Sequence, residues 1–408
     1  MKKVNLIVLS TAFLAIIVLL ALQKISLKKE TLIDFENNLN YPGLQYKTIS
    51  QFLPIPLSIH ILEIDPRKYK IEIVSGGNEK VGCEKVSSIA QKVNAIAAVN
   101  GGFFWYKCFD PKFEGIPLQI LKIGNKWYSD PIGDIAIIGW NKEGSEVDLI
   151  NLLMKWEVKI GNKIYPVNRI NKPRGKNRIV LYLPTMGENT LSSKNGTEII
   201  VDNNKVIDIE QKIGNSKIPK NGFVYSVGEW VKTDLSKIKI GDRASFSHEF
   251  LTSTADNTQT NSNLFEQWEN KEFILGGTPI LISNGEISYD FQEDDKFQDP
   301  FLLQRHPRTA IGVKPNGNWI FVVVDGRQTM FSVGMSIKEL ALFMKSLGCS
   351  KAINLDGGGS STFYYKGKIR NNPCGDFGEW HLFKKTNATE RAVSDILVVL
   401  PREEQKIA

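Results

Sequence analysis

The sequence lacks most of the motifs that mark metal, nucleotide and nucleic-acid sites. Its 408 residues include four cysteines and four histidines, with no CxxC pair and no His/Cys cluster, which argues against structural zinc. Its glycine run at 357–359 is followed by no lysine and does not read GxGxxG, so a nucleotide site is disfavoured. The lysines are scattered and the net charge is only +7, so we predict no nucleic-acid partner.

The four cysteines leave their redox state open. Cys83, Cys108, Cys349 and Cys374 form an even set behind an apolar N-terminal segment, which permits two disulfides. Sequential pairing, Cys83–Cys108 and Cys349–Cys374, would close two loops of similar size. Four unpaired thiols are the alternative.

The apolar N-terminal segment predicts a membrane anchor. Residues 4–22 are interrupted only by Asn5, Ser10 and Thr11, and lysines flank both ends. As a helix this segment spans roughly 29 Å, close to the hydrocarbon core of a bilayer. It has no clear cleavage site and no lipobox cysteine, so an uncleaved anchor is favoured over a cleaved signal.

The apolar N-terminal segment also determines the domain organisation that we expect. We predict an anchor over 1–23, a polar stalk or linker over 24–54, one domain over 55–401 and a short tail over 402–408. The domain is expected on the extracytoplasmic side of the membrane, or secreted if the segment is removed.

Hydrophobic periodicity predicts a fold with many strands and two helices. Apolar and polar residues alternate with period two after residue 57, and residues 116–250 look strand-rich. Helices are expected near 86–93 and 336–347, the second with Ser336 as its N-cap, Glu339 three residues on, and Gly348 as its stop. We therefore predict an α+β fold of mixed, largely antiparallel sheets with packed helices.

Polar residues gather where the predicted strands end. "AINLDGGGSST" places Asn354 and Asp356 beside three glycines, and "VNGGFF" places Asn100 in a similar position. "RTAIGV" and "VVVDGRQ" add Arg308 and Asp325 next to further strands, together with Thr309 and Arg327. Two arginines and two aspartates suit an anionic sugar-type ligand, because arginine binds phosphate oxygens in bidentate fashion. The alternative is Arg–Asp ion pairs that only hold loops in place.

Several motifs, and the order in which they occur, resemble those of a known family. "AAVNGGFF", "GGTPILISNGE", "RTAIGV", "VVVDGRQ", "GMSIKELALFMKSLG", "AINLDGGGSSTF" and "ERAVSDILVV" occur in the order found in the phosphodiester glycosidases. The resemblance runs from about Pro56 to Leu400. It implies hydrolysis of a sugar-1-phosphodiester, of the N-acetylglucosamine-1-phosphate type, at the glycosidic C–O bond. The expected substrate is a phosphodiester-linked glycan of the cell envelope or an exopolysaccharide.

We place the chemistry of that reaction on the motifs residue by residue. Arg308 and Arg327 are expected to bind phosphate, and Asp356 to act as base or nucleophile with Asp325 as its partner. Asn100 and Asn354 are expected to orient sugar hydroxyls or a carboxylate. The further substrate-binding candidates are Gly101, Gly102, Thr309, Gly357, Gly358, Gly359 and Ser360. A second tier consists of Glu390, Arg391 and His306.

Two other functions remain open. The same fold could serve as a non-catalytic glycan-binding or envelope-assembly module. A metal-assisted phosphodiesterase is the other reading, because Asp325, Asp356 and Asn354 offer oxygen ligands to a divalent cation. No DxDxDG-type spacing supports a cation, so no cofactor is predicted.

Overall fold

The computed structural model describes residues 32–36, 40–132, 135–254, 257–259, 262–288, 300–375, 380–384 and 389–402. The predicted anchor over 1–23 lies outside these ranges. Within them, no helix is long and apolar enough to cross a membrane. The predicted linker over 24–54 contains two strands, β1 and β2, so the folded part starts before residue 55.

Two antiparallel sheets form the first lobe. Sheet I has eight strands in the order β1 (Leu32–Glu36), β2 (Leu44–Gln51), β3 (Leu57–Ile64), β23 (Trp319–Val324), β22 (Arg308–Val313), β24 (Lys351–Asn354), β20 (Ile280–Ser283) and β21 (Glu286–Ile287). Sheet II has five strands in the order β26 (Lys368–Ile369), β25 (Phe363–Tyr365), β6 (Ala97–Asn100), β28 (Asp395–Pro401) and β4 (Tyr69–Ser75). A small β27 (Ala392–Val393) and β5 (Glu84–Lys85) pair separately.

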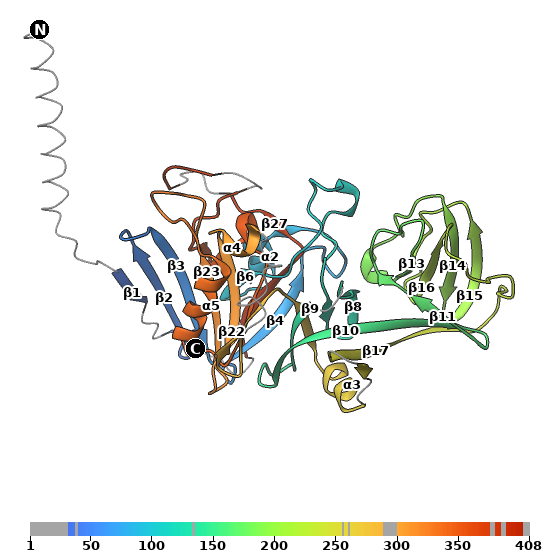
Figure 1. Cartoon of the computed structure of the whole chain (residues 1–408), viewed down its shortest axis with the longest axis horizontal. Helices are drawn as coiled ribbons and strands as arrows, with labels where there is room; N and C mark the ends of the chain where they lie inside the picture. Colours follow the sequence, from blue (N-terminus) through green and yellow to red (C-terminus); the bar gives the residue numbers. More distant parts are fainter. Residues whose placement is uncertain are drawn as a thin grey trace, which may run out of the picture.

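Two further sheets lead into a second lobe. Sheet III runs β18 (Asn257–Gln259), β17 (Ala244–Thr254), β10 (Val147–Ile160), β9 (Ile135–Trp140), β19 (Phe273–Gly276), β7 (Leu121–Ile123) and β8 (Lys126–Ser129), with β11 (Lys163–Val167) on β10. Sheet IV runs β12 (Arg169–Ile170), β13 (Ile179–Tyr182), β16 (Gly222–Gly228), β14 (Gly196–Asp202) and β15 (Lys205–Gln211). Figure 1 shows the long strands β10 and β17 reaching from the first lobe to the second, beneath sheet IV.

The described helices are short. They are α2 (Val86–Lys92), α3 (Ser262–Glu269), α4 (Pro300–Leu303) and α5 (Ile337–Ser346), with 3₁₀ turns at Pro111–Phe113, Pro184–Met186 and Gly358–Ser360. Helices α2 and α5 confirm the two predicted helices. Helix α5 begins with the predicted capping box, in which Ser336 and Glu339 bond each other's backbone N–H groups, and Gly348 follows it with φ +80°.

The predicted α+β fold with packed helices is wrong, because the structure is mostly β. Helix α5 covers one face of sheet I and α2 covers one face of sheet II, each through a small apolar cluster. The larger cores are formed where sheet faces sheet. The sequence predicts both helices correctly, but the packing of sheet on sheet sets most of the architecture.

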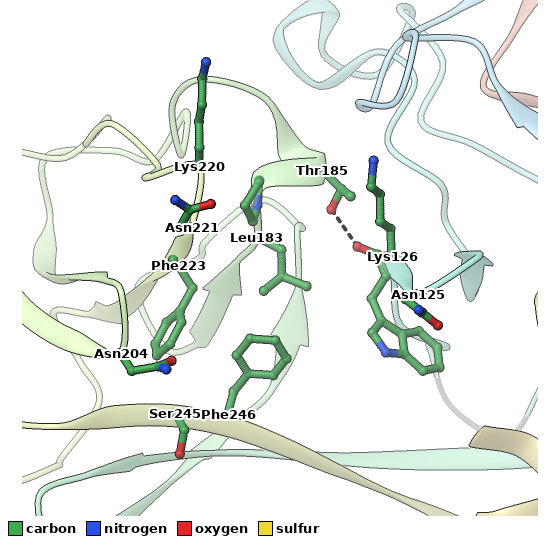
Figure 2. A pocket seen from close by; sticks show the side chains of 13 residues that line it. Asn125, Lys126, Leu183, Thr185, Asn204, Lys220, Asn221, Phe223, Ser245 and Phe246 are labelled. Carbon is green, nitrogen blue, oxygen red and sulfur yellow. Dashed lines mark hydrogen bonds between the residues drawn. The ribbon is translucent and has the colours of Figure 1, made fainter. Parts of the chain in front are cut away.

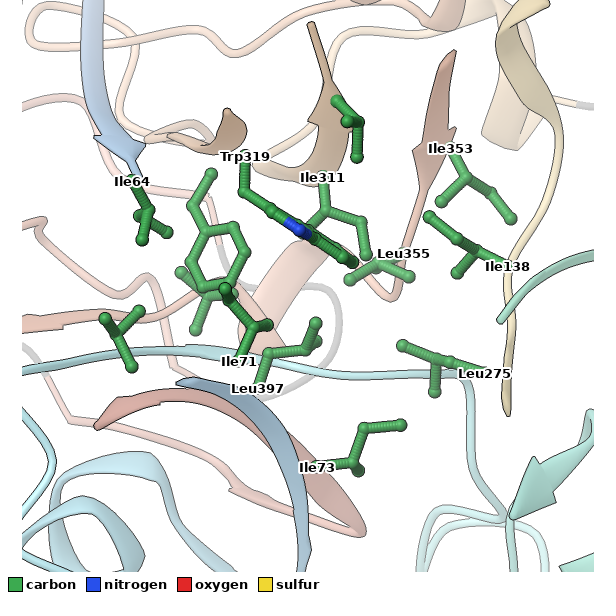
Figure 3. Packing of buried hydrophobic residues seen from close by; sticks show 14 of the residues in the cluster. Ile64, Ile71, Ile73, Ile138, Leu275, Ile311, Trp319, Ile353, Leu355 and Leu397 are labelled. Atoms are coloured by element: carbon green, nitrogen blue, oxygen red, sulfur yellow. The ribbon is translucent and has the colours of Figure 1, made fainter. Parts of the chain in front are cut away.

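The main core is filled from three sheets. Figure 3 shows Ile311, Trp319 and Ile353 of sheet I beside Ile71, Ile73 and Leu397 of sheet II and Ile138 and Leu275 of sheet III. Strand β23 alternates: Phe321 enters this core while Ile320 and Val322 pack under α5. Strand β23 is therefore buried on both faces, which explains its continuous apolar sequence.

Trp319 provides a test of this arrangement. Its ring is fully buried, lies edge-on to Trp140 at 5.1 Å, and donates from Nε1 to the Gly144 carbonyl at 2.8 Å. We expect Trp319→Ala to lower the free energy of unfolding by about 3–5 kcal/mol, because it leaves a cavity between three sheets. Urea unfolding measures this change. Trp230→Ala, at a ring that is 66% exposed, is the control and should stay within about 0.5 kcal/mol; equal effects would contradict the assignment.

Candidate active site

The ends of two strands from different sheets meet at the glycine run. Strand β24 ends at Asn354 in sheet I, and β6 ends at Asn100 in sheet II. The Asp356 N–H donates to the Gly101 carbonyl at 3.1 Å, and Asn100 Nδ2 donates to the Asp356 carbonyl at 2.7 Å. These bonds place the two Asn–Gly segments side by side.

Asn100 holds this junction together with Thr309. Its Oδ1 accepts from Thr309 Oγ1 at 2.7 Å and from the Thr362 N–H at 3.2 Å. Both side chains are fully buried. Their hydrogen bonds run within the protein, so they act as the framework of the site and leave contact with a ligand to their neighbours.

Asp356 is the carboxylate that stays partly exposed at this junction. Its Oδ1 accepts from the Gly357 N–H at 2.9 Å, and the Ser360 hydroxyl bonds the same side chain. Burial raises the pKa of Asp356 to about 6; Ser360 and Arg391 partly oppose this effect, and Asp395 adds to it. A carboxylate with such a pKa accepts protons near neutral pH, as a general base requires.

Two buried guanidinium groups pack against the glycine run. A Cβ placed on Gly358 would lie 3.0 Å from Arg327 Nη2, and one on Gly359 would lie 2.4 Å from Arg391 Nη2. The Arg391 guanidinium also lies 4.4 Å from the centre of the Tyr106 ring and donates from Nη1 to Ser360 Oγ at 3.4 Å. The glycines at 358 and 359 therefore leave the space that these arginines occupy.

Several guanidinium nitrogens of this pair are buried without a bond. Within the described part of the chain, Nε and Nη1 of Arg327 and Nε and Nη2 of Arg391 have no hydrogen-bond partner. A buried charged donor without a partner is costly. An anion such as a phosphodiester would satisfy these donors in the bidentate manner that arginine favours.

Arg308 and His306 both lie close to Arg327, but only the arginine is charged at pH 7. Arg308 is fully buried and donates from Nε to the Met335 carbonyl and from Nη2 to the Gln304 carbonyl, both at 2.9 Å. Burial and then Arg327 lower the pKa of Arg308 to about 10. Burial, Arg327 and Arg308 lower the pKa of His306 to about 4, so its ring is neutral at pH 7. The bonds of Arg308 give it a framework role; Arg391, placed only in the second tier, keeps two buried guanidinium nitrogens without a partner in the described chain.

Asp325 lies in a hydrogen-bond network of its own. Its Oδ1 accepts from Asn371 Nδ2 at 3.1 Å and the Asn372 N–H at 2.7 Å. Its Oδ2 accepts from Ser58 Oγ at 2.9 Å and lies 3.3 Å from His60 Nε2. These bonds occupy both carboxylate oxygens and favour a structural role over the predicted partnership with Asp356. No three His, Cys, Asp or Glu side chains in the described ranges gather as metal ligands.

Other predicted residues occupy defined places around the site. Glu390 accepts from the N–H and hydroxyl of Ser87, at 2.9 and 2.5 Å, and so caps α2. Asn354 donates from Nδ2 to the Thr278 carbonyl at 2.7 Å, while its buried Oδ1 has no partner in the described chain. The Gly102 N–H donates to Asp395 Oδ1 at 2.9 Å.

The sequence prediction missed Asp395 and Cys374. Asp395 is buried, and burial raises its pKa. A Cβ on Gly101 would lie 1.8 Å from Asp395 Oδ1, so the glycine makes room for this carboxylate. Asp395 is the acidic residue that precedes the apolar run of "ERAVSDILVV", which was a usable signal.

Cys374 is close enough to both arginines to be influenced by their charges. Its thiol is buried and hydrogen-bonded by Arg327; burial raises its pKa, against the opposing charges of Arg327 and Arg391. All four cysteines are unpaired, so the sequential disulfide pairing is not formed. The alternative of four thiols holds.

Comparisons with known proteins agree with these motifs. The family model of the phosphodiester glycosidases matches residues 195–400. An uncharacterised protein of Rickettsia conorii is 29% identical over 273 residues, which is 66% of this chain and 87% of that protein. The N-acetylglucosamine-1-phosphodiester alpha-N-acetylglucosaminidase of Mus musculus is 33% identical over 109 residues, which is 24% of this chain and 20% of that enzyme.

A solved structure supports the fold. A protein from Synechocystis aligns with a TM-score of 0.72 at 21% identity, over 91% of this chain and 64% of the other. This likeness concerns the fold alone. The chain thus spans less than two thirds of that protein and about a fifth of the mouse enzyme.

The raised pKa of Asp356 has a consequence for stability. Below pH 3.8, the ordinary pKa of an aspartate, the carboxyl is protonated in both the folded and the unfolded chain. Between pH 3.8 and about 6 the unfolded chain has lost this proton while the folded chain keeps it, so the free energy of unfolding falls as pH rises. We expect Asp356→Asn to raise the unfolding midpoint relative to the wild type at pH 7, with the difference shrinking toward pH 4. Urea unfolding across this range measures it. Asp208→Asn, at an exposed carboxylate, is the control; a difference independent of pH would contradict the burial of Asp356.

Proposed function

The chain belongs to the phosphodiester glycosidase family, and we propose that it hydrolyses a sugar-1-phosphodiester, of the N-acetylglucosamine-1-phosphate type, at the glycosidic C–O bond. The products are a free sugar and a phosphomonoester. The observation that carries the proposal is the pair of buried guanidinium groups, Arg327 and Arg391, packed against the glycine run beside Asp356.

The two arginines supply the phosphate site of this proposal. Their unpaired N–H groups bind the oxygens of the diester, and the absence of side chains at Gly358 and Gly359 leaves the space in which the two guanidinium groups lie. The two guanidinium groups also stabilise the negative charge that grows on the leaving phosphate as the C–O bond breaks. Arg308 adds positive charge behind Arg327 without contacting the substrate.

Asp356 supplies the other half of the chemistry. A phosphomonoester is a good leaving group, so its departure needs little protonation. The remaining requirement is an attacking group on the sugar carbon, either water that gives its proton to Asp356 or the Asp356 carboxylate itself. In both routes a new C–O bond forms at the sugar carbon, the bond from that carbon to the phosphate oxygen breaks, and Asp356 must be ionised. In the second route the sugar ester of Asp356 is then hydrolysed by water at the sugar carbon, which releases the free sugar and the carboxylate.

We extend the proposal to the place of action. The apolar segment over residues 4–22 supports attachment to a membrane with the domain on the extracytoplasmic side. The substrate would then be a phosphodiester-linked glycan of the cell envelope or an exopolysaccharide.

Hydrolysis in ¹⁸O-labelled water tests which bond breaks. With methylphospho-N-acetylglucosamine as substrate, we expect the label in the sugar and none in the phosphate. Asp356→Asn should lower kcat/KM about 10²–10⁴-fold, because it removes the base or nucleophile. Asp208→Asn, at an exposed carboxylate, is the control and should keep wild-type activity. Label in the phosphate would indicate a phosphodiesterase, and absence of turnover with retained glycan binding would indicate a binding module.

The pH profile tests the role of Asp356 separately. Because burial raises the pKa of Asp356 to about 6, we expect kcat/KM to fall as pH drops below about 6. Burial lowers the pKa of His306 to about 4, so if His306 were the base, the fall in kcat/KM on the acidic side of the profile would occur about two pH units lower. Rates measured from pH 4 to 8 distinguish the two residues; a limb near pH 4 would remove Asp356 from the mechanism.

A further inference from the structure

A hollow in the second lobe is lined by none of the residues discussed above for catalysis. It has a volume of about 430 Å³ and lies between sheet IV, the β7–β8 turn and strand β17 (Figure 2). Ligand sites in proteins usually measure roughly 300–1,000 Å³. The hollow is thus large enough for one or two sugar units.

Aromatic rings form one side of this hollow. Phe246 of β17 is 38% exposed, and its ring meets that of Phe223 edge-to-face at 5.5 Å. Figure 2 shows these two rings next to each other, with Leu183 above them. Trp127 also lines the hollow and is held by Trp156 at 5.3 Å. The buried neighbours fix the rings, so little conformational freedom is lost when a ligand packs on Phe246.

Amide side chains from three separate turns surround the rings. Asn125, Asn204 and Asn221 line the hollow and are exposed. Asn204 sits in the β14–β15 turn with φ +61°, a conformation that asparagine tolerates. Each amide offers a donor and an acceptor at once. No carboxylate is among the lining residues, while Lys220 and Lys126, the latter paired with Glu79 at 2.8 Å, add positive charge.

We propose that this hollow is a second carbohydrate site, which binds a sugar unit of a glycan. A pyranose has an apolar C–H face that packs on an aromatic ring, and hydroxyls around its edge that bond amide groups. The Phe246 ring and the three asparagines match these two features. A lipid chain would leave the amides without partners.

One segment connects this hollow with the candidate active site. Between Gly102 and Ser129 the chain carries Tyr106, which packs on the Arg391 guanidinium, and then Trp127, which lines the hollow. In this proposal a glycan long enough to occupy both places would be held at the hollow while another part of it reaches the arginines. This link to turnover rests on the proposed function, whereas sugar binding does not.

Titration of the full chain with chitotriose and with maltotriose tests the binding, measured by saturation-transfer NMR and calorimetry. We expect at least one of them to bind, and Phe246→Ala to weaken it about tenfold by removing the exposed ring. Asn221→Ala is a second variant that leaves the rings in place and should also weaken binding. Trp230→Ala removes an exposed ring that does not line the hollow and should leave binding unchanged. The site is refuted if neither sugar binds to the wild type at millimolar concentration, or if binding survives both Phe246→Ala and Asn221→Ala.

Activity assays separate this inference from the proposed function. Phe246→Ala should hydrolyse methylphospho-N-acetylglucosamine as the wild type does, but should show a raised KM for a polymeric phosphodiester glycan. Sugar binding that depends on Phe246 without any hydrolysis would leave the second site intact and refute the proposed function. Hydrolysis without Phe246-dependent sugar binding would support the proposed function and refute the second site.

Discussion

The bonds between Asp356 and the Asn100–Gly101 segment join the ends of two sheets, which also share a large apolar core. Asn100 Nδ2 and the Asp356 N–H make these bonds, and Asn100 Oδ1 is in turn held by Thr309 and Thr362. Loss of this side chain would leave several buried polar groups unpaired, each at about 1–3 kcal/mol. The position of Asp356, and of the glycine run that follows it, depends on this junction.

The site concentrates positive charge where water is excluded. Burial, and then the charge of Arg327, lowers the pKa of Arg308. Burial, and then the charges of Arg327 and Arg308, lowers the pKa of His306. Arg308 is compensated by two backbone carbonyls, but Arg327 and Arg391 retain buried N–H groups without partners in the described chain. Such an arrangement costs folding free energy and is relieved when an anion binds. Of these arginines, Arg391 also acts against the burial that raises the pKa of Asp356.

Local patterns in the sequence predicted the elements better than the architecture or the roles. The capping box of α5 and the end of β24 at Asn354 follow from short-range signals, and the structure confirms them. The fold class failed because two well-marked helices outweighed the many short strands between 116 and 250, whose pairing has no local signal. The functions of Arg308 and Asp325 could not be seen either, since they depend on partners such as Met335, His60 and Asn372 that reach them only in the folded chain.

The glycine run shows why composition alone could not separate a turn from a site. Gly358 has φ +62°, which a turn explains, but Gly359 lies outside that region and is required for another reason. A Cβ there would meet both the Gly375 carbonyl and Arg391 Nη2. Because Arg391 already lies on the Tyr106 ring, its guanidinium cannot retreat without losing that contact. The third glycine is therefore required by close packing against both the Gly375 backbone and Arg391, and under the proposed function it is needed for the anion site because it lets that arginine lie there.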